Sequence, residues 1–239
     1  MQILPIRTRK LLPPQDDLFS VLDDSLPELK DGDVLFVTSK IASIHQGYCV
    51  PMSEIDSKNK LIQQEADAVL TGTETSELPI GIINNTVNPF AGVDESNGNG
   101  YYILPPQDPN KFAAELRSYL TTWRGHVVDT IGVVIVDSVF LPMRAGSVSV
   151  SLGFAGIEPL RSYTESLDIF GRELQMSNTN IVDSLSAMAG IYFGEGNEQT
   201  PLVLMRNVEG IEFTNKNKSG ELTNLPHGDV FEKFLKMFK

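Results

Sequence analysis

Two segments of the chain contain the residue types that bind a hard divalent cation. Residues 91–98 read Ala-Gly-Val-Asp-Glu-Ser-Asn-Gly, so two carboxylates, a hydroxyl and an amide lie in a loop flanked by glycines. Asp137 and Ser138 follow the most apolar run of the sequence, where a strand end faces the loops that usually form sites. Mg²⁺ and Mn²⁺ prefer such oxygen ligands. A polar turn has the same composition, and on pattern alone the turn is the commoner outcome for both segments.

Two further segments hold charged groups suited to anions or to ion pairs. Arg144, within Leu-Pro-Met-Arg-Ala-Gly at residues 141–146, offers a guanidinium for a phosphate or carboxylate, although a solvated surface arginine is the commoner outcome. Residues 168–174 read Asp-Ile-Phe-Gly-Arg-Glu-Leu. They predict either an amphipathic helix with an ion pair between Asp168 and Arg172 or a functional segment, and the pattern does not separate the two interpretations.

The sequence excludes several common types of site. It contains no G-x-x-x-x-G-K-[ST] segment, which rules out a P-loop, and no G-x-S-x-G nucleophile elbow. The three histidines, His45, His126 and His227, share no metal-binding spacing, and we expect each of them on the surface or in a turn. Nucleotide binding would therefore need other residues.

The composition restricts the partners and the location of the protein. A formal charge of −12 and a pI near 4.7, without a basic run, disfavour nucleic acid and anionic membranes as partners. The longest apolar run, residues 131–136, is far shorter than the ~20 residues of a membrane span. Cys49 is the single cysteine, and the N-terminal residues place apolar side chains before positive ones, the reverse of a secretory signal. We expect a cytoplasmic protein with no membrane span.

The strands that would carry these residues are marked by their hydrophobic patterns. Residues 34–39 and 130–136 predict buried strands, and the second has no polar face, which indicates a central strand covered on both sides. Residues 146–154 alternate apolar side chains with serine and glycine, which predicts a half-buried strand. Further strands are expected at residues 79–87 and 202–205.

The helices are predicted from caps and from helical periodicity. The clearest helix starts at Asp108-Pro109 and ends at Gly125. Asp16 is expected to cap a first helix. The other predicted helices cover residues 58–70, 163–175 and 180–192, and a last one starts at Asp229. Strands and helices mix without a regular βαβ period, so the predicted fold class is α+β.

Taken in order, these segments resemble the F420-0:gamma-glutamyl ligase family over nearly the whole chain. Residues 91–97 match the family's most distinctive motif almost letter for letter. The other positions that carry the resemblance are residues 6–11, 16–18 and 32–40, Ser43, Gly47, Asp137, Ser138, Pro142, Arg144, Gly146, residues 153–157, Asp168, residues 170–174, Asp183, and residues 194–195. One such motif would be chance, whereas several in the family's order are specific.

The resemblance implies roles for individual residues. Asp94 and Asp137 would hold divalent metal, and Ser138 would add a hydroxyl ligand. Arg144 would join Asp94 and Asp137 as a catalytic residue. The residues implied to contact the nucleotide are Thr8, Arg9, Lys10, Leu11, Ser39, Lys40 and Asn97, and the segment near Arg206 would complete the nucleotide pocket.

The resemblance also implies an activity and an architecture. The activity joins L-glutamate to a carboxylate of coenzyme F420-0, which the γ-phosphate of GTP or ATP first activates as an acyl phosphate, with Mg²⁺ or Mn²⁺ and K⁺ as the ions. The implied fold is α+β with mixed sheets and packed helices. Residues 1–239 would form one ligase-like domain of two intimately associated subdomains. The implied assembly is an intertwined homodimer.

Departures from the family pattern leave the acceptor open. Ile44 stands where the family has a lysine, Phe140 and Leu141 where it has a glycine-arginine pair, and Ser184 where it has a glutamate. Apolar bulk near the expected phosphate sites predicts an altered acceptor pocket, so a folate or another pterin is the alternative acceptor. A further alternative is a weakened homologue that binds nucleotide or a glutamylated ligand without turnover.

Overall fold

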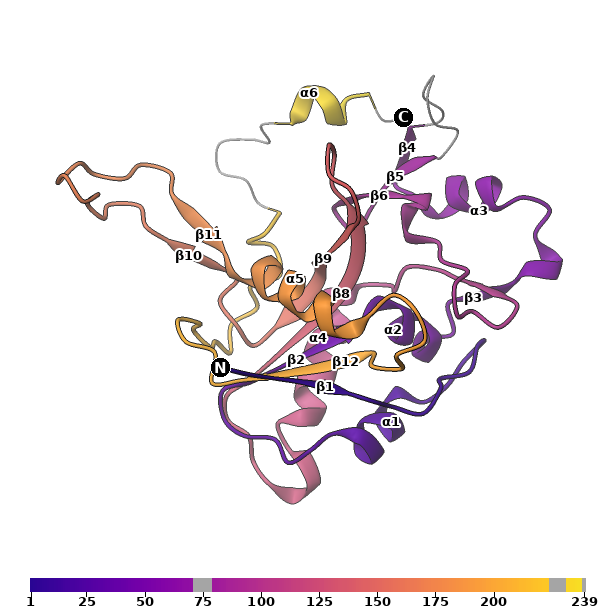
Figure 1. Cartoon of the computed structure of the whole chain (residues 1–239), viewed down its shortest axis with the longest axis horizontal. Coiled ribbons are helices and arrows are strands. Elements are labelled where there is room, and N and C mark those ends of the chain that lie inside the picture. The colour runs from indigo at the N-terminus through magenta and orange to yellow at the C-terminus, as the bar shows by residue number, and fades with distance from the viewer. Residues whose placement is uncertain (71–78, 224–230, 238–239) are drawn as a thin grey trace.

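A five-stranded mixed sheet forms the centre of the molecule (Figure 1). The computed structural model describes residues 1–70, 79–223 and 231–237. In sheet order the strands are β1 (Gln2–Ile6), β12 (Leu202–Arg206), β2 (Asp33–Thr38), β8 (Ile131–Phe140) and β9 (Ser147–Ala155). β2 and β8 are parallel, and the other neighbouring strands are antiparallel. The predicted buried strands and the α+β class are confirmed.

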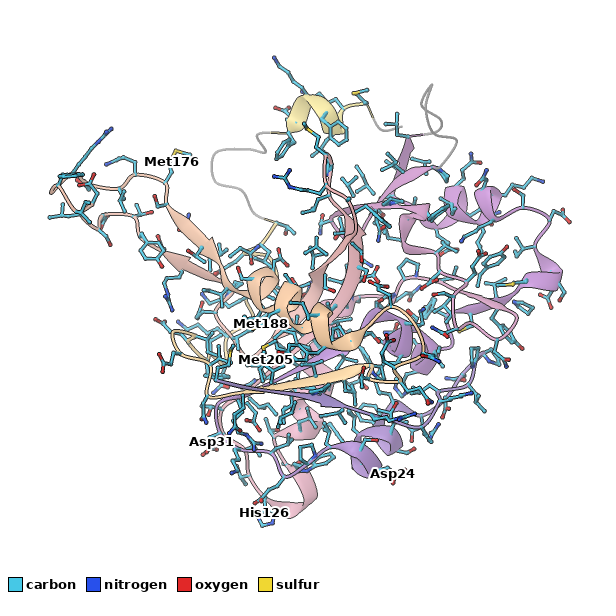
Figure 2. All side chains as sticks on the ribbon, in the orientation of Figure 1. Asp24, Asp31, His126, Met176, Met188 and Met205 are labelled. Atoms are coloured by element: carbon cyan, nitrogen blue, oxygen red, sulfur yellow. The ribbon has the colours of Figure 1, made fainter. Side chains whose placement is uncertain are left out.

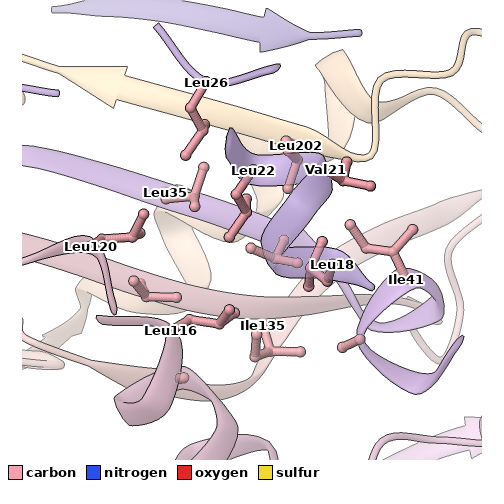
Figure 3. Close-up of a cluster of buried hydrophobic side chains, with 14 of the residues drawn as sticks. Leu18, Val21, Leu22, Leu26, Leu35, Ile41, Leu116, Leu120, Ile135 and Leu202 are labelled. Atoms are coloured by element: carbon pink, nitrogen blue, oxygen red, sulfur yellow. The ribbon is translucent and has the colours of Figure 1, made fainter. Parts of the chain in front are cut away.

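Helices cover both faces of this sheet. Three of them lie on one face: α1 (Leu18–Ser25), α2 (Ser39–Gln46) and α4 (Pro109–Leu120). Leu35 and Ile135 pack among their side chains (Figure 3). The opposite face is covered by α5 (Ile181–Phe193), which packs on Phe36 and Val134. Because successive side chains of a strand point to opposite faces, β2 and β8 are apolar on both sides and lie buried at the centre.

A β-bulge changes which side chains of β9 share a face. The pairing with β8 shifts between Ile135 and Val136, so that Leu152 is skipped. Ser149 and Ser151 therefore lie on the same side as Phe154, and this side is covered by α5. The strand is half-buried as predicted, but Ser149 is buried whereas Val148 remains partly exposed.

Residues between α2 and α4 form a second group of elements beside the main sheet. Its elements are β3 (Cys49–Pro51), the 3₁₀ turn η1 (Met52–Glu54), α3 (Lys58–Glu65), β4 (Ala68–Leu70), β5 (Ile80–Ile83), β6 (Thr86–Pro89), the 3₁₀ turn η2 (Phe90–Gly92) and β7 (Tyr101–Ile103). β3 pairs with β7, and β4, β5 and β6 form a small antiparallel sheet. Leu61, Ile62, Ala91, Val93 and Leu104 form a separate hydrophobic cluster that holds this group together.

Two predicted elements of this second group are wrong in part. The helix predicted over residues 58–70 ends at Glu65, and residues 68–70 pair with β5 as strand β4. The single strand predicted over residues 79–87 is a hairpin, because Asn84 and Asn85 both adopt positive φ angles. Asparagine tolerates this conformation better than most residues, and two such residues in succession turn the chain back on itself.

The helix predicted over residues 163–175 is also wrong. The segment belongs to an arm formed by β10 (Leu160–Ser162) and β11 (Asn178–Asn180), which extends away from the body (Figure 1) and carries Met176 (Figure 2). Asp168 does not pair with the Arg172 guanidinium. Its carboxylate accepts hydrogen bonds from the backbone N–H groups of Phe170 and Arg172, both at 2.8 Å. These bonds close a tight turn in place of a helical turn.

The two best-capped helices are confirmed. α4 starts after Asp108, whose carboxylate accepts a hydrogen bond from the N–H of Lys111, although the helix ends at Leu120 and a 3₁₀ turn, η3 (Trp123–Gly125), follows it. α5 starts after Asn180, whose side chain accepts from the N–H of Asp183. In both helices a cap satisfies a backbone donor that has no partner within the helix.

The two ends of the chain differ from the predictions in detail. Asp17, and not Asp16, caps α1, because its carboxylate accepts from the N–H of Phe19 while Asp16 pairs with Arg9. At the other end the structure describes a short helix, α6 (Glu232–Leu235), and the predicted start of that helix at Asp229 lies outside the described residues. Within the described ranges, no helix has the length and apolar character that crossing a membrane requires.

Candidate active site

A large cavity lies where β2 and β8 end on the same side of the main sheet. It has a volume of about 1400 Å³ and is lined by residues from the ranges 7–12, 38–44, 88–99, 136–149 and 190–201. The parallel register pairs Thr38 with Val136, so the residues that follow, Ser39 and Asp137, lie side by side. Sites in mixed and parallel sheets form at the carboxyl ends of strands in this way. With Lys58, which also lines the cavity, six distant parts of the sequence thus meet in one place.

Asp137 lies at the inner wall of this cavity. Its carboxylate accepts hydrogen bonds from the Ser39 hydroxyl at 2.8 Å and from the Asn88 amide at 3.3 Å. Burial raises the pKa of Asp137 to about 6, and the nearby charge of Asp94 acts in the same direction. Within the described part of the chain Asp137 forms no ion pair, and its hydrogen-bond donors and the more distant charge of Lys40 do not offset the effect of burial on its pKa.

Asp94 is held in a charged network at the mouth of the cavity. Lys40 donates to its carboxylate at 2.7 Å and also to the backbone carbonyl and hydroxyl of Ser96, at 2.8 Å and 2.9 Å. Burial alone would raise the pKa of Asp94, but the charge of Lys40 and the donors of Lys40 and Ser96 outweigh burial and lower it. Asp94 is therefore ionised and already paired, in contrast to Asp137.

The glycines of the 91–98 loop allow close approach of the backbone to other groups. Gly92 has a φ of 69°, and a Cβ atom there would lie near the Asp137 carboxylate. Gly98 lies against the backbone carbonyl of Tyr101, where a Cβ atom would clash. Asn97 extends from the loop and donates to the carbonyl of Gly196 at 3.0 Å, which joins the loop to the segment after α5. The spacing of the motif thus has a steric reason.

Two charged residues that the sequence analysis assigned no role also line the cavity. Glu195, just after α5, accepts hydrogen bonds from the hydroxyls of Ser138 at 2.9 Å and Ser147 at 2.8 Å. Lys58 lies 3.5 Å from the Glu95 carboxylate and 4.6 Å from the ring centre of Phe90. In the sequence, residues 194–195 belong to the segments that carry the family resemblance, but neither this resemblance nor the flanking glycines assigned Glu195 a role.

The N-terminal residues implied to bind nucleotide form one edge of the cavity. Thr8, Arg9, Lys10 and Leu11 all line it. The Arg9 guanidinium forms two hydrogen bonds with the Asp16 carboxylate, at 2.7 Å and 2.8 Å. These bonds, together with backbone donors, lower the pKa of Asp16 to about 2. Arg9 is therefore fixed by Asp16, whereas Lys10 forms no ion pair within the described residues.

The structure does not bring Arg206 or Arg144 to the cavity. Arg206 donates to both oxygens of the buried Asp33 carboxylate, at 2.8 Å and 2.7 Å, and so lies at the opposite end of β2. A strand of this length spans roughly 20 Å. Arg144 lies in the exposed turn between β8 and β9, outside the cavity lining. The bidentate pair with Asp33 indicates that Arg206 stabilises the sheet.

Other residues singled out in the sequence take varied positions. Ile44 and Phe140 line the cavity, whereas Leu141 does not. His45 is not a surface residue, since its ring accepts a hydrogen bond from the N–H of Leu18 at 3.1 Å and stacks on Phe112. His126 is exposed, as expected. His227 lies outside the described residues.

The donors of the cavity suit a cation with few protein ligands. Among the residues that the structure describes, no three side chains of histidine, cysteine, aspartate or glutamate gather closely enough to hold a metal ion by themselves. Asp94 and Asp137 nevertheless approach closely enough for the charge of one to raise the pKa of the other. Mg²⁺ sites commonly use one or two carboxylates and take their other ligands from water and substrate phosphates.

Comparisons with known proteins agree on one family. A family model described as F420-0:Gamma-glutamyl ligase matches residues 6–207. The coenzyme F420:L-glutamate ligase of Methanopyrus kandleri is 30% identical, over 97% of this chain and 97% of its own length. Enzymes with the same name from Methanococcus maripaludis strain DSM 14266 and Archaeoglobus fulgidus are 33% and 27% identical, over 85% and 99% of this chain and 86% and 98% of their own lengths.

We predict that Arg9→Met lowers the free energy of unfolding near pH 7 by up to about 1 kcal/mol, and that this loss fades on acidification. The folded pKa of Asp16, about 2, lies below its ordinary value of 3.8. The ion pair therefore stabilises the protein above the ordinary pKa, and its contribution disappears as pH falls toward the folded value. Urea unfolding at a series of pH values measures the difference.

The matched control is Arg7→Met, because Arg7 donates to the uncharged side chain of Gln199 at 3.2 Å. Its effect on stability should not change with pH between the two pKa values. In Arg9→Met, NMR titration should show the pKa of Asp16 returning toward its ordinary value. The same pH dependence in both variants would contradict the prediction.

Proposed function

The chain belongs to the F420-0:gamma-glutamyl ligase family, and on this basis we propose that it is an enzyme that joins L-glutamate to a carboxylate of coenzyme F420-0 at the cavity described above. One observation carries the proposal. Asp94 and Asp137, which are far apart in the sequence, meet in a cavity whose lining also includes Ser39, Lys40 and Asn97. Two carboxylates beside several nitrogen and hydroxyl donors suit a metal ion and a phosphorylated ligand.

We propose that Asp94 and Asp137 hold Mg²⁺ or Mn²⁺, with the Ser138 hydroxyl as a further ligand. The support is electrostatic. The Asp137 carboxylate is buried, repelled by Asp94 and stabilised by neutral donors, so a divalent cation would relieve an unfavourable charge. The bound cation would supply charge neutralisation and polarise a phosphate oxygen. Glu195 orients Ser138 by accepting a hydrogen bond of 2.9 Å from its hydroxyl.

The nucleotide in this proposal is GTP, with ATP as the alternative. Its phosphates would lie beside Lys40 and Lys10, where positive charge lines the cavity. Lys40 is partly buried and now paired with Asp94, so its ammonium group is already held at the metal-binding carboxylate. Ser39 and Asn97 add neutral donors on either side. An anionic nucleotide needs local cations of this kind to bind to an anionic protein.

The proposed reaction forms and breaks two bonds. A carboxylate oxygen of the acceptor attacks the γ-phosphorus of the nucleotide, and the nucleoside diphosphate leaves, which produces an acyl phosphate. The amino nitrogen of L-glutamate then attacks the acyl carbon, the carbon–oxygen bond to phosphate breaks, and the nitrogen loses a proton as the amide forms. Both steps bring anions together, so positioning and charge neutralisation by the residues of the cavity account for the catalysis.

We predict that Asp94→Asn and Asp137→Asn each abolish turnover and weaken metal-dependent GTP binding at least tenfold, because each removes a carboxylate from the proposed cation. Titration calorimetry with GTP, in the presence of Mg²⁺ and in the presence of EDTA, measures the affinity. The control is Asp129→Asn, an exposed aspartate outside the cavity lining, which should bind as the parent protein does. Circular dichroism checks that each variant is folded. Undiminished Mg²⁺-dependent affinity in both cavity variants would overturn the assignment.

The acceptor has an alternative that a specific observation favours. Phe140 lines the cavity with 55% of its surface exposed, and Ile44 adds an apolar wall, where the family pattern has polar or flexible residues. A folate offers an aromatic ring for such walls, whereas F420-0 carries an anionic phosphodiester that needs cationic partners. Lys10 lines the cavity as one such partner, and the relatives are named for F420, so F420-0 is the acceptor that we propose.

We predict that incubation with L-glutamate, Mg²⁺ and GTP extends F420-0 by a glutamyl residue, detected by product mass, and leaves reduced folates unchanged. Repeating the assay with ATP and with Mn²⁺ decides the nucleotide and the ion. Consumption of folates with F420-0 untouched would reverse the choice of acceptor. Metal-dependent GTP binding without any product would favour the weakened homologue.

We also propose a homodimer, supported by the arm between β10 and β11. Its side chains include large apolar groups with 65–92% of their surface exposed: Leu167, Ile169, Phe170 and Met176. Such a patch on a projecting element is typical of a protein contact.

Sedimentation at micromolar concentration should give twice the chain mass of 26.3 kDa, and Ile169→Glu with Phe170→Glu should reduce it to one chain. Val127→Glu, on another exposed apolar residue, is the control. A monomeric parent protein would contradict the proposal.

A further inference from the structure

A second cavity, of about 450 Å³, lies between α4 and the loop formed by residues 214–219. It includes residues 154–157 at the end of β9, whereas the active-site cavity includes Ser147 and Ser149 of the same strand. Five residues of extended chain separate Ser149 from Phe154, which corresponds to roughly 17 Å. The two cavities therefore have separate linings at opposite ends of one strand.

The lining of this second cavity is positively charged, whereas the protein as a whole is negatively charged. Four cationic side chains lie in it, namely Lys111, Arg117, Lys216 and Lys218, against a single carboxylate, Asp108. The chain as a whole has a formal charge of −12. The Asp108 carboxylate caps α4 by accepting from the N–H of Lys111, so it is directed at the helix end. A local excess of positive charge in an acidic protein attracts anions.

In the part of the chain that the structure describes, most of this positive charge has no carboxylate partner. Within the described residues, Lys111, Arg117 and Lys216 form no ion pair, and only Lys218 is neutralised, by Glu158 at 3.1 Å and Glu221 at 2.7 Å. Arg117 is half-buried, yet it donates to two uncharged oxygens, the carbonyl of Ile131 at 2.9 Å and the side-chain amide of Asn215 at 2.6 Å. A guanidinium that loses water without gaining an anion is unfavourable.

The backbone is shaped to keep Arg117 in this place. Gly156 has a φ of 87°, and a Cβ atom there would clash with the Arg117 side chain and with the Ile131 carbonyl that it contacts. The loop opposite is held by its own bonds, because Thr214 and Asn217 side chains accept from the backbone N–H groups of Lys216 and Ser219. Close packing and hydrogen bonds thus hold the Arg117 guanidinium and the backbone of the loop in place.

We propose that this second cavity binds an oxyanion of the phosphate class, either inorganic phosphate or the phosphate group of a small monoester. The forked guanidinium and two lysine ammonium groups match the tetrahedral array of phosphate oxygens. The N-terminus of α4, which also lines the cavity at Asn110 and Lys111, adds a favourable partial positive charge. This proposal is independent of the reaction at the active site.

The test is an NMR titration of the full chain, labelled with ¹⁵N, against inorganic phosphate and separately against glycerol phosphate. We expect saturable shifts of the backbone amides of residues 215–219 and of Lys111. In Lys111→Gln with Lys216→Gln, two exposed positions, the affinity at these amides should fall at least tenfold. In Lys30→Gln with Lys60→Gln, which removes the same charge from exposed positions outside both cavity linings, it should stay unchanged.

The two ligands distinguish the source of the phosphate group, since the tighter one identifies it, and binding of either supports the proposal. Phosphate that binds only in the active-site cavity would shift the amide of Ser96 and leave residues 215–219 unmoved, which would overturn it. Equal shifts with sodium chloride at the same ionic strength would also overturn it, because they would reflect charge screening alone. Equal affinity in the Lys111 and Lys216 variant would have the same consequence.

Discussion

The parallel pairing of β2 with β8 is the constraint on which the candidate active site depends. Both strands are apolar and buried on both faces, so a slip by one residue would exchange the side chains that pack in the two hydrophobic clusters and disrupt both. Their register places Thr38 opposite Val136 and therefore fixes Ser39 beside Asp137. The packing of the hydrophobic core thus fixes the positions of Ser39 and Asp137, the first polar groups of the cavity. The loops that carry Asp94 and Glu195 are arranged around this fixed point.

The two carboxylates of the cavity, Asp94 and Asp137, differ in how their negative charges are stabilised. Asp94 forms an ion pair with Lys40, whereas Asp137 is hydrogen-bonded to the neutral side chains of Ser39 and Asn88 and feels the charge of Lys40 only at a distance. The pKa values of the two carboxylates therefore move in opposite directions. A site designed only for stability would pair or remove the buried carboxylate, because an unpaired buried charge is costly. Its presence beside a second carboxylate supports the cation-binding role that we propose.

The sequence predicted those elements whose signals are local and strong. The uninterrupted apolar run of β8 and the Asp108-Pro109 cap of α4 were sufficient. The helix over residues 163–175 failed because periodicity cannot reveal that Asp168 bonds to the backbone N–H groups of its own turn. Arg206 and Glu195 depend on contacts with residues more than 50 positions away, Asp33 and Ser138. Individual residues give no sign of such contacts, so the sequence suggested the cavity and not its complete lining.

The position of Glu195 follows from how closely α5 packs on β9. The bulge at Leu152 turns three serines of β9 toward this helix, and Gly190 leaves room for Ser149, because a Cβ atom there would clash with the serine hydroxyl. One end of α5 is held by the bond between Asp183 and Ser151, and the other end then carries Glu195 to Ser147 and Ser138. A polar strand face that reads as solvent-exposed in the sequence is in fact the surface that aligns a helix with the site. The other end of β9 lines the cationic cavity, so residues of this one strand contribute to both cavities.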